Sequence, residues 1–502
     1  MIETKKYCVS AGTQVPFNNH ADFCVGTGRM GLALQKAYME QLNLVQEKIG
    51  FKHIRGHGLF CDDMAIYHEY KNEAGETVAE YNFTYLDMVM DNYREVGIRP
   101  FLEIGFMPEK LASGTQTIFY WKGNTTPPKD YDGWAKLVQA TIKHLMDRYG
   151  ADDVVTWPIE VWNEPNLPGF WEKADMQEYF RLFKCTILAI KEIDKRFRVG
   201  GPAICGINDP LWIRSFLEYC RENKLAVDFI SRHHYTIKNP DPVGHYGYTE
   251  LMDPDKGLAE LKGTRDIVDS FEEFKNLEIH ITEFNTAYIP NAPIHDTNQN
   301  AAYVAYLLSK LGDVNESYSY WTFGDIFEEM GVPFTPFHGG FGLVANGLIP
   351  KPTFWTFSFF KQLQGVCVHH ASDSIVVKKE DGTYCGVAFN NSVDRTGKQL
   401  CLDFQLPVAE KDYALLTKTV DEKSCNPLKI WHDLGEPANP SKEQTALIKE
   451  GANPFVSTCR LHADKNSVTF KLTVEEYGVV YFEITKTGGS SDRGYSYERA
   501  TK

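Results

Sequence analysis

The chain has 502 residues, a formal net charge of -15 at pH 7, 43% hydrophobic residues and 24% charged residues. These fractions are typical of globular proteins and exclude extensive disorder, and the length predicts two to four domains or one large barrel with an appendage. The acidic balance argues against nucleic acid or an anionic membrane as a partner, because phosphate groups bind to basic surfaces.

No apolar run approaches the roughly 20 residues that a membrane-spanning helix needs. The N-terminal stretch "MIETKKYCVSAGTQVPFNNH" lacks the apolar segment of a signal peptide, so we expect a cytoplasmic protein. The 11 Cys residues are scattered, without CxxC pairs or His partners at metal-ligand spacing. This pattern predicts reduced thiols and argues against a zinc site.

Short apolar runs alternate with amphipathic stretches through the first two thirds of the chain. The runs predict eight strands, at residues 22–26, 51–57, 99–105, 157–164, 198–204, 229–235, 277–285 and 318–325. Between them, stretches such as Met176–Asp194 repeat apolar residues at helical spacing. Eight strands with room for a helix after each predict an α/β fold, a (β/α)₈ TIM barrel over residues 21–348.

The rest of the chain is organised differently. From about Pro350 the pattern becomes β-rich, and we expect a β-sandwich domain over residues 349–486, with a hairpin turn at Asp381-Gly382 and a short helical insertion near "SKEQTALIKEGA". Residues 1–20 precede the barrel and are expected to pair with this sandwich. The polar, Gly- and Ser-rich residues 487–502 predict a loose tail.

The fourth predicted strand, "WPIEVWNE", ends in Asn163 and Glu164. Barrel strands are buried on both faces and active sites lie where they end, so these two side chains are expected at the barrel mouth. Pro165 then turns the chain away from the sheet. Glu160 lies four residues deeper, and we interpret it as structural, hydrogen-bonded to a neighbouring strand.

The seventh predicted strand carries a second carboxylate, Glu283, which lies 119 residues (283 minus 164) after Glu164. That spacing equals three βα units of about 40 residues, which places the two acids across one mouth from each other. A glycosidase needs such a pair, because one carboxyl group protonates the leaving oxygen while the other attacks or activates water.

Other predicted strand ends are also polar: Arg55 and His57; Arg232, His233, His234 and Tyr235; and Trp321, Asp325, Glu328 and Glu329. Hydrogen-bonding groups at several strand ends indicate a ring around one mouth. There is no G-x-S-x-G motif, and no Cys is predicted at a strand end beside a His with a clear partner, so a nucleophilic triad is not expected.

A glycine motif near the N-terminus resembles a dinucleotide-binding loop. Gly26, Gly28 and Gly31 form G-x-G-x-x-G between a predicted strand and a helical pattern. The acidic residue expected about 20 positions later is missing, since the segment "FKHIRGHG" is basic there. Nucleotide binding is therefore disfavoured.

Together, "WPIEVWNEPN", "HITEFNTAY", "SRHHY" and "YWTFGDIFEEMGVP" resemble the β-xylosidases of glycoside hydrolase family 39, within a clan of retaining (β/α)₈ glycosidases. "GTGRMGLALQKAY", "IRGHGLF", "GFMPEKLASG", "FYWKGNTTPPKDY" and "HGGFGLVANGLIPKPTF" extend the resemblance. It covers residues from about 20 to 360 closely and the C-terminal region more loosely.

The resemblance implies that Glu164 is the general acid/base, Glu283 the nucleophile and Asn163 the partner of the sugar 2-hydroxyl. It also implies that the site is lined by His57, Phe119, Trp121, His233, Tyr235, Tyr288, Trp321, Glu328 and Glu329. "SRHHY" departs from the family pattern, which leaves open whether His233 or His234 faces the sugar, although strand alternation keeps His233 and Tyr235 on one face. No metal or organic cofactor is implied, and the family suggests a homo-oligomer such as a tetramer.

The leading hypothesis is a retaining exo-β-1,4-xylosidase that removes xylose from the non-reducing end of short xylo-oligosaccharides. The alternatives are an α-L-iduronidase-like enzyme, a β-glucosidase and an α-L-arabinopyranosidase. The first is disfavoured because its substrate carries a uronate carboxylate, which Glu328 and Glu329 would repel. A non-catalytic sugar-binding protein is a third reading, disfavoured because desolvated acids are costly without a chemical task. For the retaining mechanism we predict about 5–5.5 Å between the carboxyl groups of Glu164 and Glu283.

Overall fold

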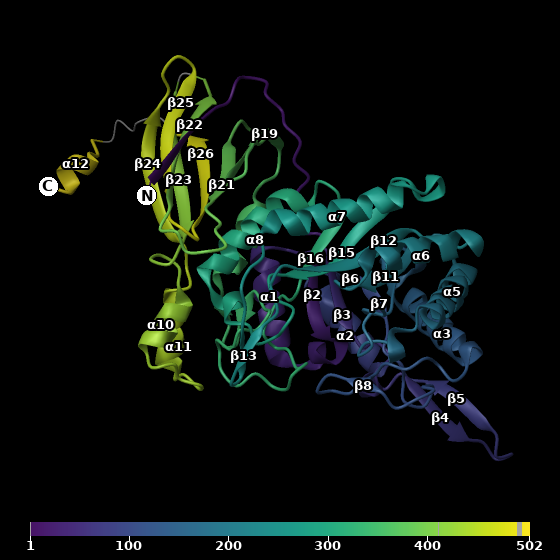
Figure 1. Ribbon diagram of the computed structural model, residues 1–502. Helices are drawn as coiled ribbons and strands as arrows, with labels where there is room; N and C mark the ends of the chain where they lie inside the picture. The colour runs from purple at the N-terminus through teal and green to yellow at the C-terminus, as the bar shows by residue number, and fades with distance from the viewer. Residues whose placement is uncertain (1, 410, 489–493) are drawn as a thin grey trace.

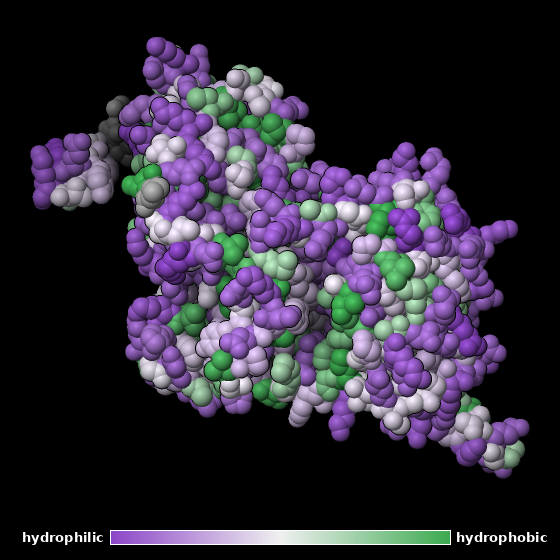
Figure 2. Space-filling view, in the orientation of Figure 1, coloured by the Kyte–Doolittle hydropathy of each residue, from purple (hydrophilic) through white to green (hydrophobic). Residues whose placement is uncertain are grey.

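The computed structural model describes residues 2–409, 411–488 and 494–502. A barrel and a β-sandwich lie side by side, and both marked chain ends are on the sandwich side (Figure 1). Hydrophilic residues dominate the face drawn in Figure 2, where hydrophobic residues form small separate groups. Within the described ranges, no helix combines the length and apolar character needed to cross a bilayer.

The barrel is built from parallel strands, and one of them is divided in two. In chain order the described strands are β2 (Cys24–Arg29), β3 (His53–His57), β6 (Arg99–Pro100), β7 (Leu102–Ile104), β10 (Ile159–Val161), β11 (Val199–Ile204), β12 (Phe229–Tyr235), β15 (Glu278–Asn285) and β16 (Ser317–Tyr320). Because β6 pairs with β3 and β7 pairs with β10, the third predicted strand closes the ring on either side of Phe101. The predicted TIM barrel is confirmed.

Helices follow the strands and surround the sheet. They are α1 (Lys36–Lys48), α2 (Thr84–Glu95), α3 (Tyr131–Tyr149), α4 (Ala151–Val154), α5 (Met176–Ile193), α6 (Asp209–Glu222), α7 (Pro254–Asp269), α8 (Asn298–Leu311) and α9 (Pro352–Lys361). Apolar residues at helical spacing give α5 one buried face, and Asp175 caps its first turn by accepting from the backbone of Gln177 and Glu178. Helix α9 packs on α8 although it lies in the range predicted for the sandwich, so we propose that the second domain starts nearer Val366.

The loops between the barrel elements carry short antiparallel pairs. These are β4 (Tyr67–Lys71) with β5 (Thr77–Tyr81), β8 (Thr117–Ile118) with β9 (Gly123–Asn124), β13 (Asp241–Val243) with β14 (Tyr246–Tyr248), and β17 (Val344–Ala345) with β18 (Ile349–Pro350). The β4–β5 hairpin projects from the barrel (Figure 1). The turn between β8 and β9 carries Phe119 and Trp121, and the ring of Phe119 stacks on His57 at the end of β3.

The second domain contains two packed sheets in the described residues. One has the order β1 (Ile2–Cys8), β22 (Gln399–Pro407), β25 (Ser467–Val474); the other has β19 (Val366–His370), β20 (Ser374–Lys378), β21 (Tyr384–Phe389), β26 (Val479–Lys486), β23 (Asp412–Val420), β24 (Phe455–His462). Buried Phe404, Phe470 and Phe482 pack between them, which confirms the predicted β-sandwich. The N-terminal strand β1 runs parallel to β22 and adds an edge to the smaller sheet.

The second domain also contains a hairpin, a helical insertion and the C-terminal residues. The hairpin predicted at Asp381-Gly382 is confirmed, because β20 and β21 pair across it and Gly382 has φ of 84°. The helical insertion consists of α10 (Pro427–Asp433) and α11 (Lys442–Glu450). Part of the predicted tail, residues 489–493, lies outside the described residues, and the described remainder contains the short helix α12 (Tyr497–Ala500).

The glycine motif serves close packing in the barrel. A Cβ atom on Gly26 would lie 2.3 Å from the Trp321 ring, and one on Gly28 would lie 3.0 Å from the Phe327 ring. Since Trp321 follows β16, these glycines let the last and first barrel strands approach each other. This packing explains the motif without a phosphate ligand.

Candidate active site

Glu164 reaches the barrel mouth through an abrupt turn at the end of β10. The strand ends at Val161, so the predicted strand 157–164 is too long. Trp162 and Glu164 then adopt left-handed φ values of 72° and 46°, a conformation that costs non-glycine residues about 1–2 kcal/mol each. The Glu164 amide donates to the Ala203 carbonyl at 2.9 Å, which ties the turn to β11. The chain therefore leaves the sheet early in order to present this carboxyl group.

Glu164 and Glu283 meet around one imidazole. Nδ1 of His233 lies 2.7 Å from Oε1 of Glu164 and 3.4 Å from Oε2 of Glu283. The sum of these two distances is the greatest possible separation of those two oxygens. Two carboxyl groups that share one ring nitrogen in this way are compatible with the retaining separation of about 5–5.5 Å that we predict.

Glu283 is held by groups that favour its ionised form. Arg55 donates from Nη1 to Oε1 at 2.6 Å, and Tyr235 donates from its hydroxyl to Oε2 at 2.6 Å. Burial raises the pKa of Glu283 above its usual value, while the charge of Arg55 and the bond from Tyr235 limit that rise. These donors align the carboxyl group and favour its ionised form.

Arg55 is the centre of a buried polar network inside the barrel. Besides Glu283 it contacts Glu160 through Nε at 2.5 Å, and through Nη2 both Asn163 and Glu103 at 2.9 Å. Asn163 accepts from Arg55 through Oδ1, so its amide Nδ2 is the group that can donate to a ligand. The guanidinium thus holds the carboxylates of Glu283, Glu160 and Glu103 and the amide of Asn163 in one rigid arrangement.

The partners of Glu160 differ from the prediction. It is fully buried, but it bonds to Arg55 on β3 and accepts from the Thr282 hydroxyl on β15 at 2.8 Å, rather than bonding to the adjacent strands β7 and β11. The reason is that its side chain points into the barrel interior, where partners come from across the ring.

Glu164 differs electrostatically from Glu283. Burial, and then the nearby charge of Glu283, raise the pKa of Glu164 well above its usual range. Burial, then the charge of Glu283 and then that of Glu164 raise the pKa of Glu329 well above its usual range. The sequence led us to expect that the charge of Glu283 helps to raise the pKa of Glu164, and it is the second cause after burial. Glu164 is the member of the pair suited to hold a proton.

The structure separates the two neighbouring histidines. His233 and Tyr235 both contact the carboxylate pair, whereas His234 lies against α7, where a Cβ on Gly257 would come within 2.6 Å of its ring. His233 therefore faces the mouth, in line with strand alternation. Burial keeps the pKa of His233 well below its usual value, so the ring is neutral.

Aromatic rings surround this carboxylate pair. The centroid of Trp321 lies 4.8 Å from that of His57, Phe119 stacks on His57 at 5.8 Å, and Trp121 lies 5.1 Å from Phe119. Tyr288 is 46% exposed and its ring lies 6.3 Å from Tyr235 at the outer edge. Flat faces beside polar groups suit a sugar ring.

His57 and the two acids after β16 complete the lining. Nδ1 of His57 contacts Glu103 at 2.8 Å, and Nε2 lies 3.6 Å from Glu283 and 3.7 Å from Glu329. Glu328 instead accepts from Arg29 at 2.8 Å, so its charge is compensated. Of the two acids, Glu329 is the one placed beside the carboxylate pair of Glu164 and Glu283.

Sequence reasoning missed three residues of the network. Arg55 was noted only as polar, although its alternation with His57 in "HIRGH" places both on one face. Glu103 is a buried charge inside an apolar strand, the same signal that Glu160 gave. Cys205 follows β11, and its sulfur lies within 4.8 Å of a carboxylate oxygen of Glu164 and a ring nitrogen of His233. The expectation that no Cys stands at a strand end beside a paired His is therefore wrong.

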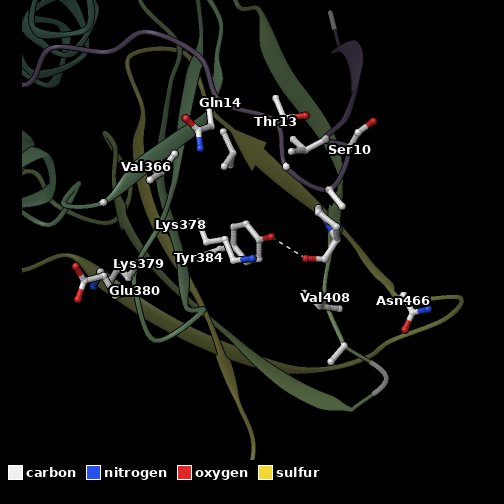
Figure 3. Close-up of a pocket in the computed structure, with 17 residues that line it drawn as sticks. Ser10, Thr13, Gln14, Val366, Lys378, Lys379, Glu380, Tyr384, Val408 and Asn466 are labelled. Atoms are coloured by element: carbon white, nitrogen blue, oxygen red, sulfur yellow. Dashed lines mark hydrogen bonds between the residues drawn. The ribbon is translucent and has the colours of Figure 1, made fainter.

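A second hollow lies on the sandwich and lacks this chemistry. Residues 9–14, the start of β19, the β20–β21 turn and the end of β22 line a cavity of about 770 Å³ (Figure 3). Tyr384 donates to the Pro407 carbonyl at 2.7 Å, and Lys378 lies 5.4 Å from its ring centroid. Glu380 is the single acidic residue of the described lining, so this cavity offers no carboxylate pair.

Comparisons with known proteins agree with this geometry. The family model "Glycosyl hydrolases family 39" matches residues 8–469. A beta-xylosidase of Geobacillus stearothermophilus is 46% identical over 93% of this chain and 93% of the relative, and one of Caldicellulosiruptor saccharolyticus is 34% identical over 92% and 94%. The crystal structure of a monomeric beta-xylosidase from Caulobacter crescentus CB15 superposes with a TM-score of 0.88, at 29% identity over 96% of this chain and 100% of that one.

Proposed function

Because the chain belongs to glycosyl hydrolases family 39, we propose that it is a retaining exo-β-1,4-xylosidase acting on short xylo-oligosaccharides. The observation that carries the proposal is the pair of buried carboxyl groups that meet at His233: the pKa of Glu164 is raised well above its usual range, and Glu283 accepts from Arg55 and Tyr235. The similarity to two curated beta-xylosidases over most of the chain supports the substrate class.

In the first step, Glu283 attacks the anomeric carbon and forms a glycosyl ester. The bond from that carbon to the leaving oxygen breaks, and Glu164 gives its proton to this oxygen. The donors Arg55 and Tyr235 orient the attacking carboxylate, while Asn163 can donate to the sugar 2-hydroxyl through Nδ2.

In the second step, Glu164 removes a proton from water, which attacks the anomeric carbon and frees Glu283. Esterification has neutralised Glu283 by then, so its repulsion of the Glu164 carboxylate disappears and the pKa of Glu164 falls. One residue can therefore act first as an acid and then as a base. Two displacements leave the sugar with its original β configuration.

The two acids after β16 give little charge-based selection against a uronate. Burial and the charge of Glu283 raise the pKa of Glu329 and favour its neutral form, while Glu328 is paired with Arg29. The preference for a neutral pentose over a uronate is instead supported by the two beta-xylosidase relatives. We propose a pentose as the preferred substrate.

The oligomeric state of the chain needs a separate measurement. The family resemblance suggested a homo-oligomer, but one similar beta-xylosidase is described as monomeric, so membership of the family does not require association. Light scattering on the purified chain distinguishes a monomer from a tetramer.

A panel of nitrophenyl glycosides tests the function. We expect the β-xyloside to be cleaved with the highest kcat/KM, above the β-glucoside, α-L-arabinopyranoside and α-L-iduronide. With xylotetraose we expect xylose and xylotriose as the first products, since an exo enzyme removes one unit at a time. Xylose binding without turnover would favour a sugar-binding protein, and faster cleavage of the iduronide would favour the alternative enzyme.

A further inference from the structure

Three different potential metal ligands converge beside the catalytic acid. One ligand atom each of Glu164, Cys205 and His233 lies within 4.8 Å of the others. Glu164 and His233 are buried and Cys205 is half-buried. The three residues come from the carboxyl ends of β10, β11 and β12, which are neighbours in the sheet. Their spacing in the sequence therefore gave no metal-binding motif.

We propose that Glu164, Cys205 and His233 form an inhibitory binding site for a thiophilic divalent cation such as Zn²⁺ or Cd²⁺. Zinc bonds of about 2.0–2.3 Å in a tetrahedron require ligand atoms about 3.4–3.6 Å apart. Nδ1 of His233 and Oε1 of Glu164, now 2.7 Å apart, have to move farther apart to bind the cation. The most distant two of the three ligand atoms, at most 4.8 Å apart, have to move closer together. Side-chain torsions can supply both changes.

The donor set selects the kind of cation. A thiolate with an imidazole and a carboxylate favours Zn²⁺ and similar ions over Mg²⁺ and Ca²⁺, which prefer oxygen ligands. His233 is buried, and its second ring nitrogen, Nε2, has no hydrogen-bond partner among the described residues. Water can take the fourth position, as it does in open three-ligand zinc sites.

The surrounding charge is of both signs. The charges of Glu283 and Glu103 act on Glu164, whereas Arg55 and Arg232 are close enough to His233 to add to the lowering of its pKa by burial. Binding replaces the thiol proton of Cys205 and the carboxyl proton of Glu164, so two protons leave as the cation enters. The carboxyl oxygen of Glu164 that would donate a proton to the leaving group then coordinates the cation instead. The first chemical step is therefore blocked. This inhibition rests on the proposed function, but metal binding itself does not.

Cobalt titration of the purified full-length protein tests the binding. Co²⁺ bound to a thiolate gives a charge-transfer absorption in the near ultraviolet, which we expect in the wild type. We expect Cys205→Ser and Cys205→Ala to lose this band and to bind Co²⁺ at least about tenfold more weakly. Cys459→Ser, which changes an exposed thiol on β24, is the matched control and should keep both. An unchanged band in both Cys205 variants would overturn the proposal.

Zinc inhibition of β-xyloside hydrolysis is the second measurement. We expect Zn²⁺ to inhibit the wild type reversibly, with activity restored by a chelator, and Mg²⁺ at the same concentration to have no effect. Cys205→Ser should need at least about ten times more Zn²⁺ for half inhibition. Equal inhibition of wild type and Cys205→Ser would refute the site. If no xyloside is hydrolysed at all, the proposed function fails while the cobalt result still stands.

Discussion

Replacing Tyr235 by Phe removes one hydrogen bond from Glu283, the proposed nucleophile, without changing the shape of the site. The hydroxyl donates to Oε2 of Glu283 at 2.6 Å and lowers the pKa of that carboxyl group. A hydrogen bond to a charged group is worth about 1.5–3 kcal/mol, and one pKa unit corresponds to about 1.36 kcal/mol. Tyr235→Phe should therefore raise the pKa of Glu283 by about one to two units.

The sign of the effect on activity follows from the role of Glu283. Only the carboxylate attacks, so activity falls as the pH drops through the pKa of Glu283. A higher pKa moves this acid limb of the kcat/KM profile to higher pH by the same one to two units, roughly. The variant should lose more activity at low pH than at high pH, where Glu283 is ionised in both proteins.

The assay is the pH dependence of kcat/KM for nitrophenyl β-xyloside, with melting temperatures measured on both proteins. Tyr67→Phe is the matched control, because Tyr67 donates to Glu69 at 2.8 Å on the β4–β5 hairpin, remote from the network around Glu283. It should leave the acid limb in place. An acid limb that stays unchanged in Tyr235→Phe would refute the reasoning, even if overall activity falls.

Three further outcomes test other parts of the account. Glu160→Gln should lower the free energy of unfolding by about 3–5 kcal/mol in denaturant, because Arg55 loses a buried partner. The control Glu3→Gln, at the exposed ion pair with Lys398, should lower it by less than about 1 kcal/mol. Equal losses would contradict the buried network. Glu164→Gln should abolish the alkaline limb of kcat/KM for nitrophenyl β-xyloside, since the raised pKa of Glu164 sets that limb; a surviving limb would assign it to another group. Proton NMR should detect β-xylose as the first product, and α-xylose first would indicate single displacement.

Much of the fold and the acid pair could be predicted because both depend on local pattern and periodicity. Buried parallel strands appear as apolar runs, and the similar length of successive βα units is enough to predict that Glu164 and Glu283 lie at one mouth. Strand alternation was also sufficient to put His233 and Tyr235 on one face.

The parts that could not be predicted depend on contacts across the barrel. Glu160 reaches β3 and β15, Glu328 pairs with Arg29 nearly 300 residues earlier in the chain, and Cys205 joins Glu164 and His233 from a different strand end. None of these contacts has a fixed spacing in the sequence, because loop lengths between strands vary. The early end of β10 was missed for a related reason, since left-handed φ at Trp162 has no compositional signal such as glycine.

The most direct test of the central claim is the configuration of the azide product formed by two alanine variants. In Glu164→Ala, dinitrophenyl β-xyloside should still form the ester with Glu283, which accumulates because no base activates water. Azide needs no deprotonation, so it should release the ester as β-xylosyl azide. In Glu283→Ala, azide must take the place of the nucleophile and should give the α-azide. An α-azide from Glu164→Ala, or azide rescue of Glu160→Ala instead, would contradict the assignment of the acid and the nucleophile.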